Sequence, residues 1–254
     1  MTRGWLTGAV FAFLISPAIA ATPLDLYVAG KYQAAIDAGV AQNSAAGLAM
    51  ASRAALADAM MHETPCLECL QRAEGFARKA VALDPKLPEG HIYLAVNLGY
   101  EGRILGPVAA QLKGFAQEAK SELDVALATN PNNAFALAAL GGWNIEIVRN
   151  GGARIASWVF DASTKDGLRA FQRAFQIMPA NIAVRYQYAL ALSGYDLDQY
   201  RTAVEDSLSR ACAGKPVTAY ESFALKRARE LLDVLKKNDL SDYARLVKRD
   251  QGYP

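Results

Sequence analysis

Three prolines, Pro85, Pro131 and Pro179, lie 46 and 48 residues apart, and small residues recur around each of them. The fifth residue before each proline is an alanine, and the tenth residue after it is alanine or glycine. Small residues at fixed offsets are typical of places where helices cross closely. The spacing therefore predicts an array of helical repeats, an architecture that usually provides a binding surface.

The first 20 residues have the pattern of a secretory signal peptide. Arg3 precedes an apolar run, 5–15, and Ala18 and Ala20 form the small-x-small pattern of a cleavage site. This pattern argues against the alternative, an uncleaved anchor, and the run is shorter than the roughly 20 residues of a membrane span. We therefore expect a periplasmic or secreted protein with a single domain, 21–254, and no membrane span in it.

The composition narrows the class of protein. The chain has 27 Lys and Arg residues against 25 Asp and Glu residues, a net charge of +2. With charges so nearly balanced, the chain lacks the basic stripe of a nucleic-acid-binding protein. We therefore expect no nucleic-acid partner. Many alanines and leucines, with few β-branched runs, favour helix throughout the chain.

Each proline separates two predicted helices. The segment before Pro131 is amphipathic, with Ala119, Leu123 and Ala126 on one face, and the segments before the other prolines have the same apolar offsets. Proline ends a helix because it cannot donate a backbone hydrogen bond and because it restricts the residue before it. A new apolar segment follows each proline. The pattern predicts an all-α solenoid of about four helix pairs.

The segments 133–141 and 171–179 fit a known repeat best. They resemble the tetratricopeptide repeat (TPR), which has Leu-Gly in its first helix and Ala-x3-aromatic spacing before a proline in its second. Residues 26–36 suggest a further, N-terminal unit, so the resemblance covers about 24–212. It implies that the first helix of each pair lines a concave surface.

The units are longer than a TPR, which takes about 34 residues. The surplus lies between the two helices of a unit, in the segments 102–114 and 150–163, and both are apolar enough to predict packed helical extensions. Gly141-Gly-Trp143 followed by the segment 155–160 is similar to the TPR fold shared by the periplasmic T-component of TRAP transporters and the regulator-of-microtubule-dynamics proteins. This narrower resemblance covers 134–190.

A further amphipathic helix is expected at 219–237, where apolar residues follow helical spacing. We interpret it as a cap over the last repeat, which a solenoid needs. The alternative is that it folds back into the concave groove.

Cys66 and Cys69 form the motif that most resembles a reactive site. Thr64 and Pro65 suit a helix start, which would place both thiols at a helix N-terminus, as in dithiol oxidoreductases. The βαβ framework of those enzymes is missing, so a local disulfide is the expected state and a redox function is a remote alternative. No fourth ligand joins these cysteines and His62 in a zinc site, so no metal is expected. Cys212 is left unpaired.

We expect no catalytic activity and no cofactor. His91 lies beside predicted core positions, which makes a packed histidine a better interpretation than a general base. The chain lacks the Gly-x-Ser-x-Gly motif and the phosphate-binding glycine loop.

A binding groove is the candidate site. The residues four, seven and eleven positions after each proline lie on one face of the first helices, and this face is distinct from the core face. Its members are Glu89, Ile92, Val96, Phe135, Ala138, Gly142, Ala183, Tyr186 and Leu190. This apolar face predicts a groove for a protein segment, which would make the chain a protein-binding module with an unidentified partner, such as a periplasmic or transporter component. The alternative is an accessory of the TRAP T-component type that binds a hydrophobic small molecule or lipid.

Overall fold

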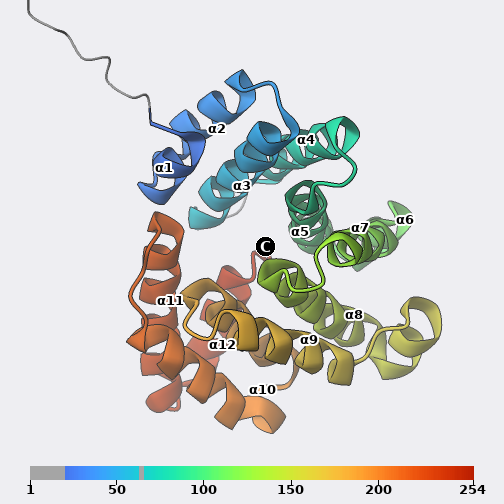
Figure 1. Cartoon of the computed structure of the whole chain (residues 1–254). Coiled ribbons are helices and arrows are strands. Elements are labelled where there is room, and N and C mark those ends of the chain that lie inside the picture. Colours follow the sequence, from blue (N-terminus) through green and yellow to red (C-terminus); the bar gives the residue numbers. More distant parts are fainter. Residues whose placement is uncertain (1–20, 63–65) are drawn as a thin grey trace, which may run out of the picture.

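The computed structural model describes residues 21–62 and 66–254, and these form helices joined by short turns, without a β-strand (Figure 1). The helices are α1 (Pro23–Val28), α2 (Tyr32–Ala41), α3 (Ala45–Met61), α4 (Leu67–Leu83), α5 (Pro88–Leu105), α6 (Pro107–Leu112), α7 (Phe115–Thr129), α8 (Ala134–Phe160), α9 (Thr164–Ile177), α10 (Ile182–Ala213), α11 (Ala219–Lys236) and α12 (Leu240–Asp250). The predicted all-α class is confirmed. The predicted signal peptide, 1–20, lies outside the described residues.

Successive helices form hairpins, as the sequence indicates. The pairs are α1/α2, α3/α4, α5/α7, α8/α9, the two halves of α10, and α11/α12. Helix α10 reverses at Asp196, where the backbone leaves the helical region, so that Ser207 Oγ donates a hydrogen bond of 2.9 Å to the carbonyl of Arg185. The described residues thus contain more pairs than the four expected. The alanine-rich helix α3 and the polar helix α12 lack the proline signature from which the pairs were counted.

The small residues of the repeat mark the helix crossings. Ala80, Ala126 and Ala174 have no exposed surface, and each accepts a hydrogen bond from the residue directly before the repeat proline. One close crossing joins α8 and α9. A Cβ on Gly141 would lie 2.5 Å from Phe171 Cδ2 and 3.0 Å from the carbonyl of Gly167. Only glycine leaves room for this approach.

The repeat prolines also anchor side chains through their carbonyl groups. His91 Nε2 donates to Pro85 at 2.9 Å, and Arg185 Nε donates to Pro179 at 3.2 Å. These two basic residues occupy the same offset, six residues after their proline. Each bond ties the turn that follows a second helix to the first helix of the next unit.

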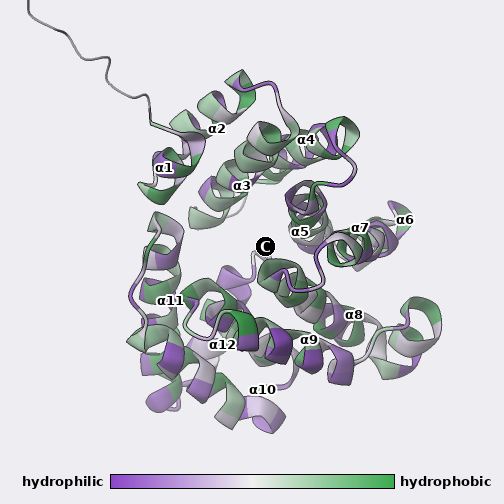
Figure 2. Ribbon diagram, viewed as in Figure 1, coloured by the Kyte–Doolittle hydropathy of each residue, from purple (hydrophilic) through white to green (hydrophobic). Residues whose placement is uncertain are grey.

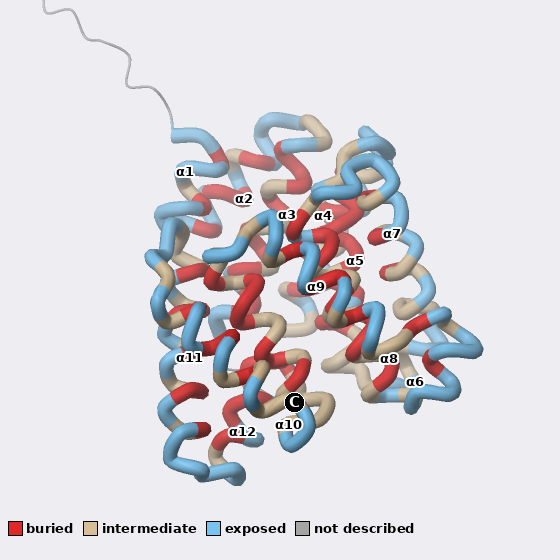
Figure 3. The backbone as a smooth tube through the Cα atoms, turned by 60° about the horizontal axis from the view of Figure 1, so that its bottom comes forward, coloured by how far each residue is buried: buried red, intermediate tan, exposed pale blue. Residues whose placement is uncertain are grey.

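Both insertions are helical, but they pack less than the sequence suggests. The first forms α6, which has no buried residue, and the second forms the end of α8 beyond a kink at Gly152 (φ +73). Leu112 is 85% exposed and Trp158 is 91% exposed, and both segments are mostly pale blue in Figure 3. The expectation of packed extensions therefore fails for α6 and holds only in part for the second insertion, where Ala156 and Ala162 are buried and Phe160 packs against Trp143. Several of their apolar side chains, such as Val108 and Ile155, face solvent, and the end of α8 is coloured hydrophobic in Figure 2.

The helix array closes on itself. Helix α11 packs on α10 and also contacts α1 and α3, at the other end of the chain (Figure 1). Ala219 and Tyr220 join the cluster of Tyr27 and Tyr32, and a Cβ on Gly30 would lie 2.8 Å from the Cβ of Ala219. Helix α11 covers the last repeat, as expected of a C-terminal cap. The helix also bridges the last repeat to the first, so the solenoid becomes a ring.

Helix α5 contains a buried carboxyl group. Glu101 on α5 is 1% exposed, and one of its oxygens has no hydrogen-bond partner among the described residues. Burial, reinforced by the carboxylate of Glu74, raises the pKa of Glu101 to about 8. The folded protein therefore retains a proton that the unfolded chain releases near its ordinary value of 4.5. The contribution of the neutral Glu101 carboxyl to the stability of the fold is fully present below that pKa. This contribution is lost as the pH rises through about 8.

We predict that Gly141→Ala destabilises the protein by about 1–3 kcal/mol, because the new methyl group overlaps Phe171 and the α9 backbone. Gly142→Ala is the matched control, since a Cβ there meets nothing within 4 Å. Chemical denaturation of both variants measures the difference. Equal stability of the two would contradict the crossing described for α8 and α9.

We predict that Glu101→Gln raises the melting temperature at pH 9 by at least about 2–4 °C, the shift that 1 kcal/mol produces in a domain of this size. The amide removes the cost of ionising a buried carboxyl, whereas at pH 4 both side chains are neutral and the melting temperatures agree. Glu89→Gln, at an exposed position of the same helix, serves as the control. A uniform shift at both pH values would contradict the prediction.

Candidate functional site: a central cavity

The ring surrounds a cavity of about 520 Å³. Its wall comes mainly from the first helices of four successive pairs, α3, α5, α8 and the first half of α10. Residues of α1, α6, α7, α9 and the start of α11, together with the C-terminal residues, complete it. The volume lies within the range of about 300–1,000 Å³ that is typical of small-molecule sites.

Most of the wall is apolar, because each first helix has two hydrophobic faces. One face packs against the partner helix, and the other faces the ring interior. The interior face includes Leu56, Ala57, Met60, Ile92, Val96, Ala138, Ala183, Leu190 and Ala191. The periodicity of apolar residues alone does not distinguish these two faces. Counting positions from the repeat prolines does distinguish them.

The structure places most of the predicted groove residues in this wall. Ile92, Val96, Phe135, Ala138 and Leu190 line the cavity, as do Gly142 and Ala183. Glu89 is exposed and lies outside the lining.

Tyr186, the remaining predicted groove residue, does not line the cavity. It is 2% exposed and borders a separate small cavity with Tyr220 and Asp250. Burial and the nearby Asp250 carboxylate raise the pKa of Tyr186 well above its usual value. The C-terminal helices cover this side of α10, so assigning Tyr186 to the groove was wrong. It is a core residue.

The C-terminal tail enters the ring, and the end of the chain lies near its centre in Figure 1. Gln251 Nε2 donates to the carbonyl of Leu190 at 2.8 Å, and its Oε1 accepts from Arg149 Nη1 at 3.0 Å. The Tyr253 hydroxyl is hydrogen-bonded to Glu146. Sequence reasoning missed this segment, which has no periodic pattern. The helix 219–237 caps the array, while the tail that follows α12 occupies the ring.

Arg103 lies in a polar cluster at the C-terminal tail, where its charge is balanced by Glu146. Its Nη1 donates to the carbonyl of Gln251 at 3.0 Å, and its Nη2 lies 3.3 Å from Glu146 Oε2. Burial alone would raise the pKa of Glu146, but Arg103, Tyr253 and Arg149 together hold it below its usual value. Glu146 therefore remains charged at neutral pH and balances Arg103.

Arg53 is the other arginine in the wall, and its surroundings differ. Its guanidinium carbon lies 4.3 Å from the ring centre of Tyr27 and 5.8 Å from that of Phe135. Among the residues that the structure describes, no carboxylate lies within 4.0 Å of it. Aromatic faces, and not an ion pair, hold this cation.

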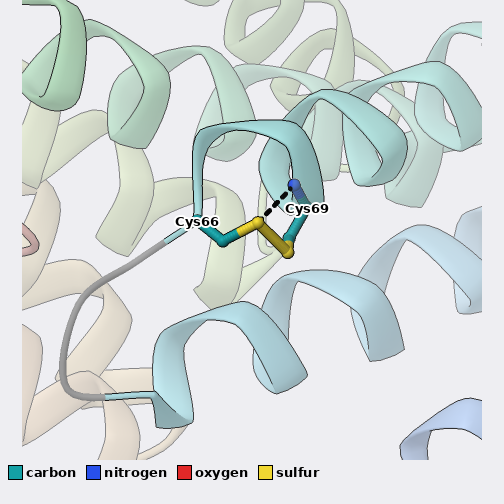
Figure 4. The surroundings of a disulfide bond; sticks show 2 residues. All are labelled: Cys66 and Cys69. Carbon is teal, nitrogen blue, oxygen red and sulfur yellow. Dashed lines mark hydrogen bonds between the residues drawn. A yellow bond between two sulfur atoms is a disulfide. The ribbon is translucent and has the colours of Figure 1, made fainter.

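The two cysteines are joined in a disulfide away from the cavity (Figure 4). Helix α4 begins at Leu67, after the predicted start, and Cys66 is its N-cap, with Sγ accepting a hydrogen bond from the backbone N–H of Cys69 at 3.0 Å. Thr64 and Pro65 lie outside the described residues. Burial raises the pKa of the Cys212 thiol, which disfavours a reactive thiolate there.

His91 has the surroundings of a packed residue. It is buried, its Nδ1 lies 2.5 Å from Glu122 Oε2, and its Nε2 donates to Pro85. Both ring nitrogens are therefore engaged. Within 21–62 and 66–254, no three His, Cys, Asp or Glu side chains are arranged to hold a metal ion.

In the same part of the chain, none of the helices combines the length and the hydropathy needed to cross a membrane. No curated protein matches the sequence significantly. A family model described as "Regulator of microtubule dynamics protein 1-3" matches residues 38–236, from α2 to the end of α11. The match includes all four helices that form most of the cavity wall. The chain belongs to the regulator of microtubule dynamics family.

Proposed function

We propose that this protein is a non-catalytic binding protein that holds one hydrophobic ligand in its central cavity. The observation that supports this function best is the closure of the ring. It places the second apolar face of four helices around a single space of about 520 Å³. An open solenoid would offer those faces as a broad groove for a partner, whereas a ring of this size suits a small molecule.

The chemistry of the wall favours an apolar ligand. Transfer from water to this wall is favourable by about 25 cal/mol for each Å² of apolar surface buried. The side chains with catalytic potential are engaged elsewhere, because Cys66 and Cys69 are bonded to each other and His91 is held by Glu122 and Pro85. Binding without chemical conversion is therefore the proposed activity.

The signal-peptide pattern in the first 20 residues supports binding in the periplasm or outside the cell. The resemblance of 134–190 to the T-component of TRAP transporters supports a membrane transporter component as the partner of this protein.

A second candidate function is recognition of a protein segment by the same cavity. The favouring observation is the chain's own tail, which lies in the wall and is bound through its backbone and side chains. A partner segment of similar chemistry would take its place. This alternative preserves the protein-binding role predicted from the concave groove.

We predict that Ala138→Trp lowers the affinity for the neutral fluorescent probe N-phenyl-1-naphthylamine at least about tenfold, because an indole ring would fill the cavity next to α8. A tenfold change corresponds to about 1.4 kcal/mol. Ala128→Trp, at an exposed position on α7, is the matched control and retains the wild-type affinity. Native mass spectrometry of protein from its own cells adds a second readout, in which the wild type retains a small-molecule adduct that Ala138→Trp lacks. Absence of both probe binding and an adduct in the wild type would refute the proposed function.

For the second candidate, we predict that a chain lacking residues 251–254 binds a synthetic peptide of residues 248–254, whereas the intact chain does not. The intact chain already occupies the site with its own tail. Calorimetry with the same peptide bearing Tyr253→Ala provides the control, because it removes the hydroxyl that bonds to Glu146. Equal binding of both peptides, or none, would argue against segment recognition.

A further inference from the structure

We propose that the ligand carries an anionic oxygen group at one end, a carboxylate or a phosphate, and that Arg53 binds this group. The inference rests on the proposed function and specifies its ligand as an apolar chain with one anionic end. It comes from a comparison of the two arginines in the cavity wall, since Arg103 has a carboxylate within 4.0 Å and Arg53 has none among the described residues.

Arg103 has its partners within the protein. Glu146 supplies a carboxylate at 3.3 Å, and the carbonyl of Gln251 accepts a hydrogen bond of 3.0 Å. A buried cation paired in this way is neutralised. Arg103 therefore has a structural role, holding the tail in the ring.

Arg53 has the opposite arrangement. It lies on α3 in the same apolar wall, and among the described residues no carboxylate comes within 4.0 Å of it. The closest approach of an aromatic ring is that of Tyr27, with a ring centre 4.3 Å from the guanidinium carbon. Stacking on aromatic faces fixes the plane of a guanidinium and leaves N–H donors at its edge available.

Glu221 is the carboxylate that could have neutralised Arg53, since it lines the same cavity. Its two oxygens are instead taken by other donors, the side-chain amide of Asn181 at 2.9 Å and the backbone N–H of Val217 at 2.8 Å. These bonds hold the carboxylate of Glu221, in the first turn of α11, against Val217 and the start of α10. The cavity thus contains a cation that has no ion pair among the described residues, with the charge of Glu221 acting on it from beyond 4.0 Å.

A guanidinium in an apolar wall is costly unless an anion accompanies it. Carboxylate and phosphate groups both match its planar fork of donors, and the two hydrogen bonds that form are stronger than neutral ones. An anionic end at Arg53 would direct the rest of the ligand along the apolar side chains of α5 and α8, towards the tail. The wall along that path includes Ile92, Val96 and Ala138.

The test compares dodecanoate, dodecyl phosphate and dodecanol, which share one apolar chain, by displacement of N-phenyl-1-naphthylamine from the full protein. We expect the wild type to bind both anions at least about tenfold more tightly than the alcohol. Arg53→Met removes this preference, weakening the anions tenfold or more and changing dodecanol less than about twofold. Arg53→Lys retains part of the preference, because it preserves the charge but loses the planar fork.

Arg210→Met is the matched control, since it removes an exposed arginine on α10 that is far from the lining and leaves all three affinities unchanged. The wild-type preference can be measured without any variant, so a folding defect in Arg53→Met does not weaken the test.

Equal affinity of the wild type for anion and alcohol would overturn the role of Arg53 and leave the proposed hydrophobic binding intact. An equal loss for all three ligands in Arg53→Met would also overturn it, by showing that Arg53 only shapes the wall. Binding of none of the three would refute the proposed function and this inference together.

Discussion

The contact between α11 and the first helices is the constraint on which the rest of the structure depends. It joins the last repeat to the first through Ala219 and Tyr220, which pack against Tyr27 and Tyr32. The approach is close enough that a Cβ on Gly30, which has a φ of +74, would lie 2.8 Å from Ala219. Glycine satisfies both the backbone conformation and the lack of space. Without this contact the helix pairs would form an open solenoid, and the cavity would be a groove.

Ring closure explains why the first helices can have two apolar faces. One face packs against the second helix of the pair, with small residues such as Gly141 and Gly167 at the crossings. The other would be a large exposed apolar surface in an open array, and such surfaces normally mark binding sites. In the ring it becomes the wall of the central cavity, whose few polar groups include Arg53, Arg103, Glu146, Glu221 and the C-terminal tail. Those groups determine which apolar ligands the cavity accepts.

The local and periodic features of this fold could be predicted from the sequence. The prolines located the helix ends because proline acts on its own backbone, and the offsets from Pro85 and Pro131 identified Ile92, Val96, Phe135 and Ala138 as interior residues. Tyr186 shows the limit of that method. It has the groove offset, but α12, which is distant in sequence, covers it.

The unpredicted features depend on contacts between segments that are far apart in the chain. The insertions are apolar in sequence, yet Trp158 is 91% exposed, because the contacts of this segment are made by Ala156, Phe160 and Ala162. The tail enters the ring through Gln251, whose partners Arg103 and Arg149 lie more than 100 residues earlier. Arg53 resembles any other arginine in a helix, and only the structure shows that Glu221 is held elsewhere. Single-sequence patterns contain no signal for such pairings.

A crystal structure of the protein with dodecanoate would show directly whether the closed ring is a binding site. We expect continuous density for the alkyl chain inside the ring, between α5 and α8, with the carboxylate on the Arg53 guanidinium and Arg103 still bonded to Glu146. Density on the outer surface, or an unliganded cavity at saturating ligand, would contradict the central claim that the closed ring is a binding site.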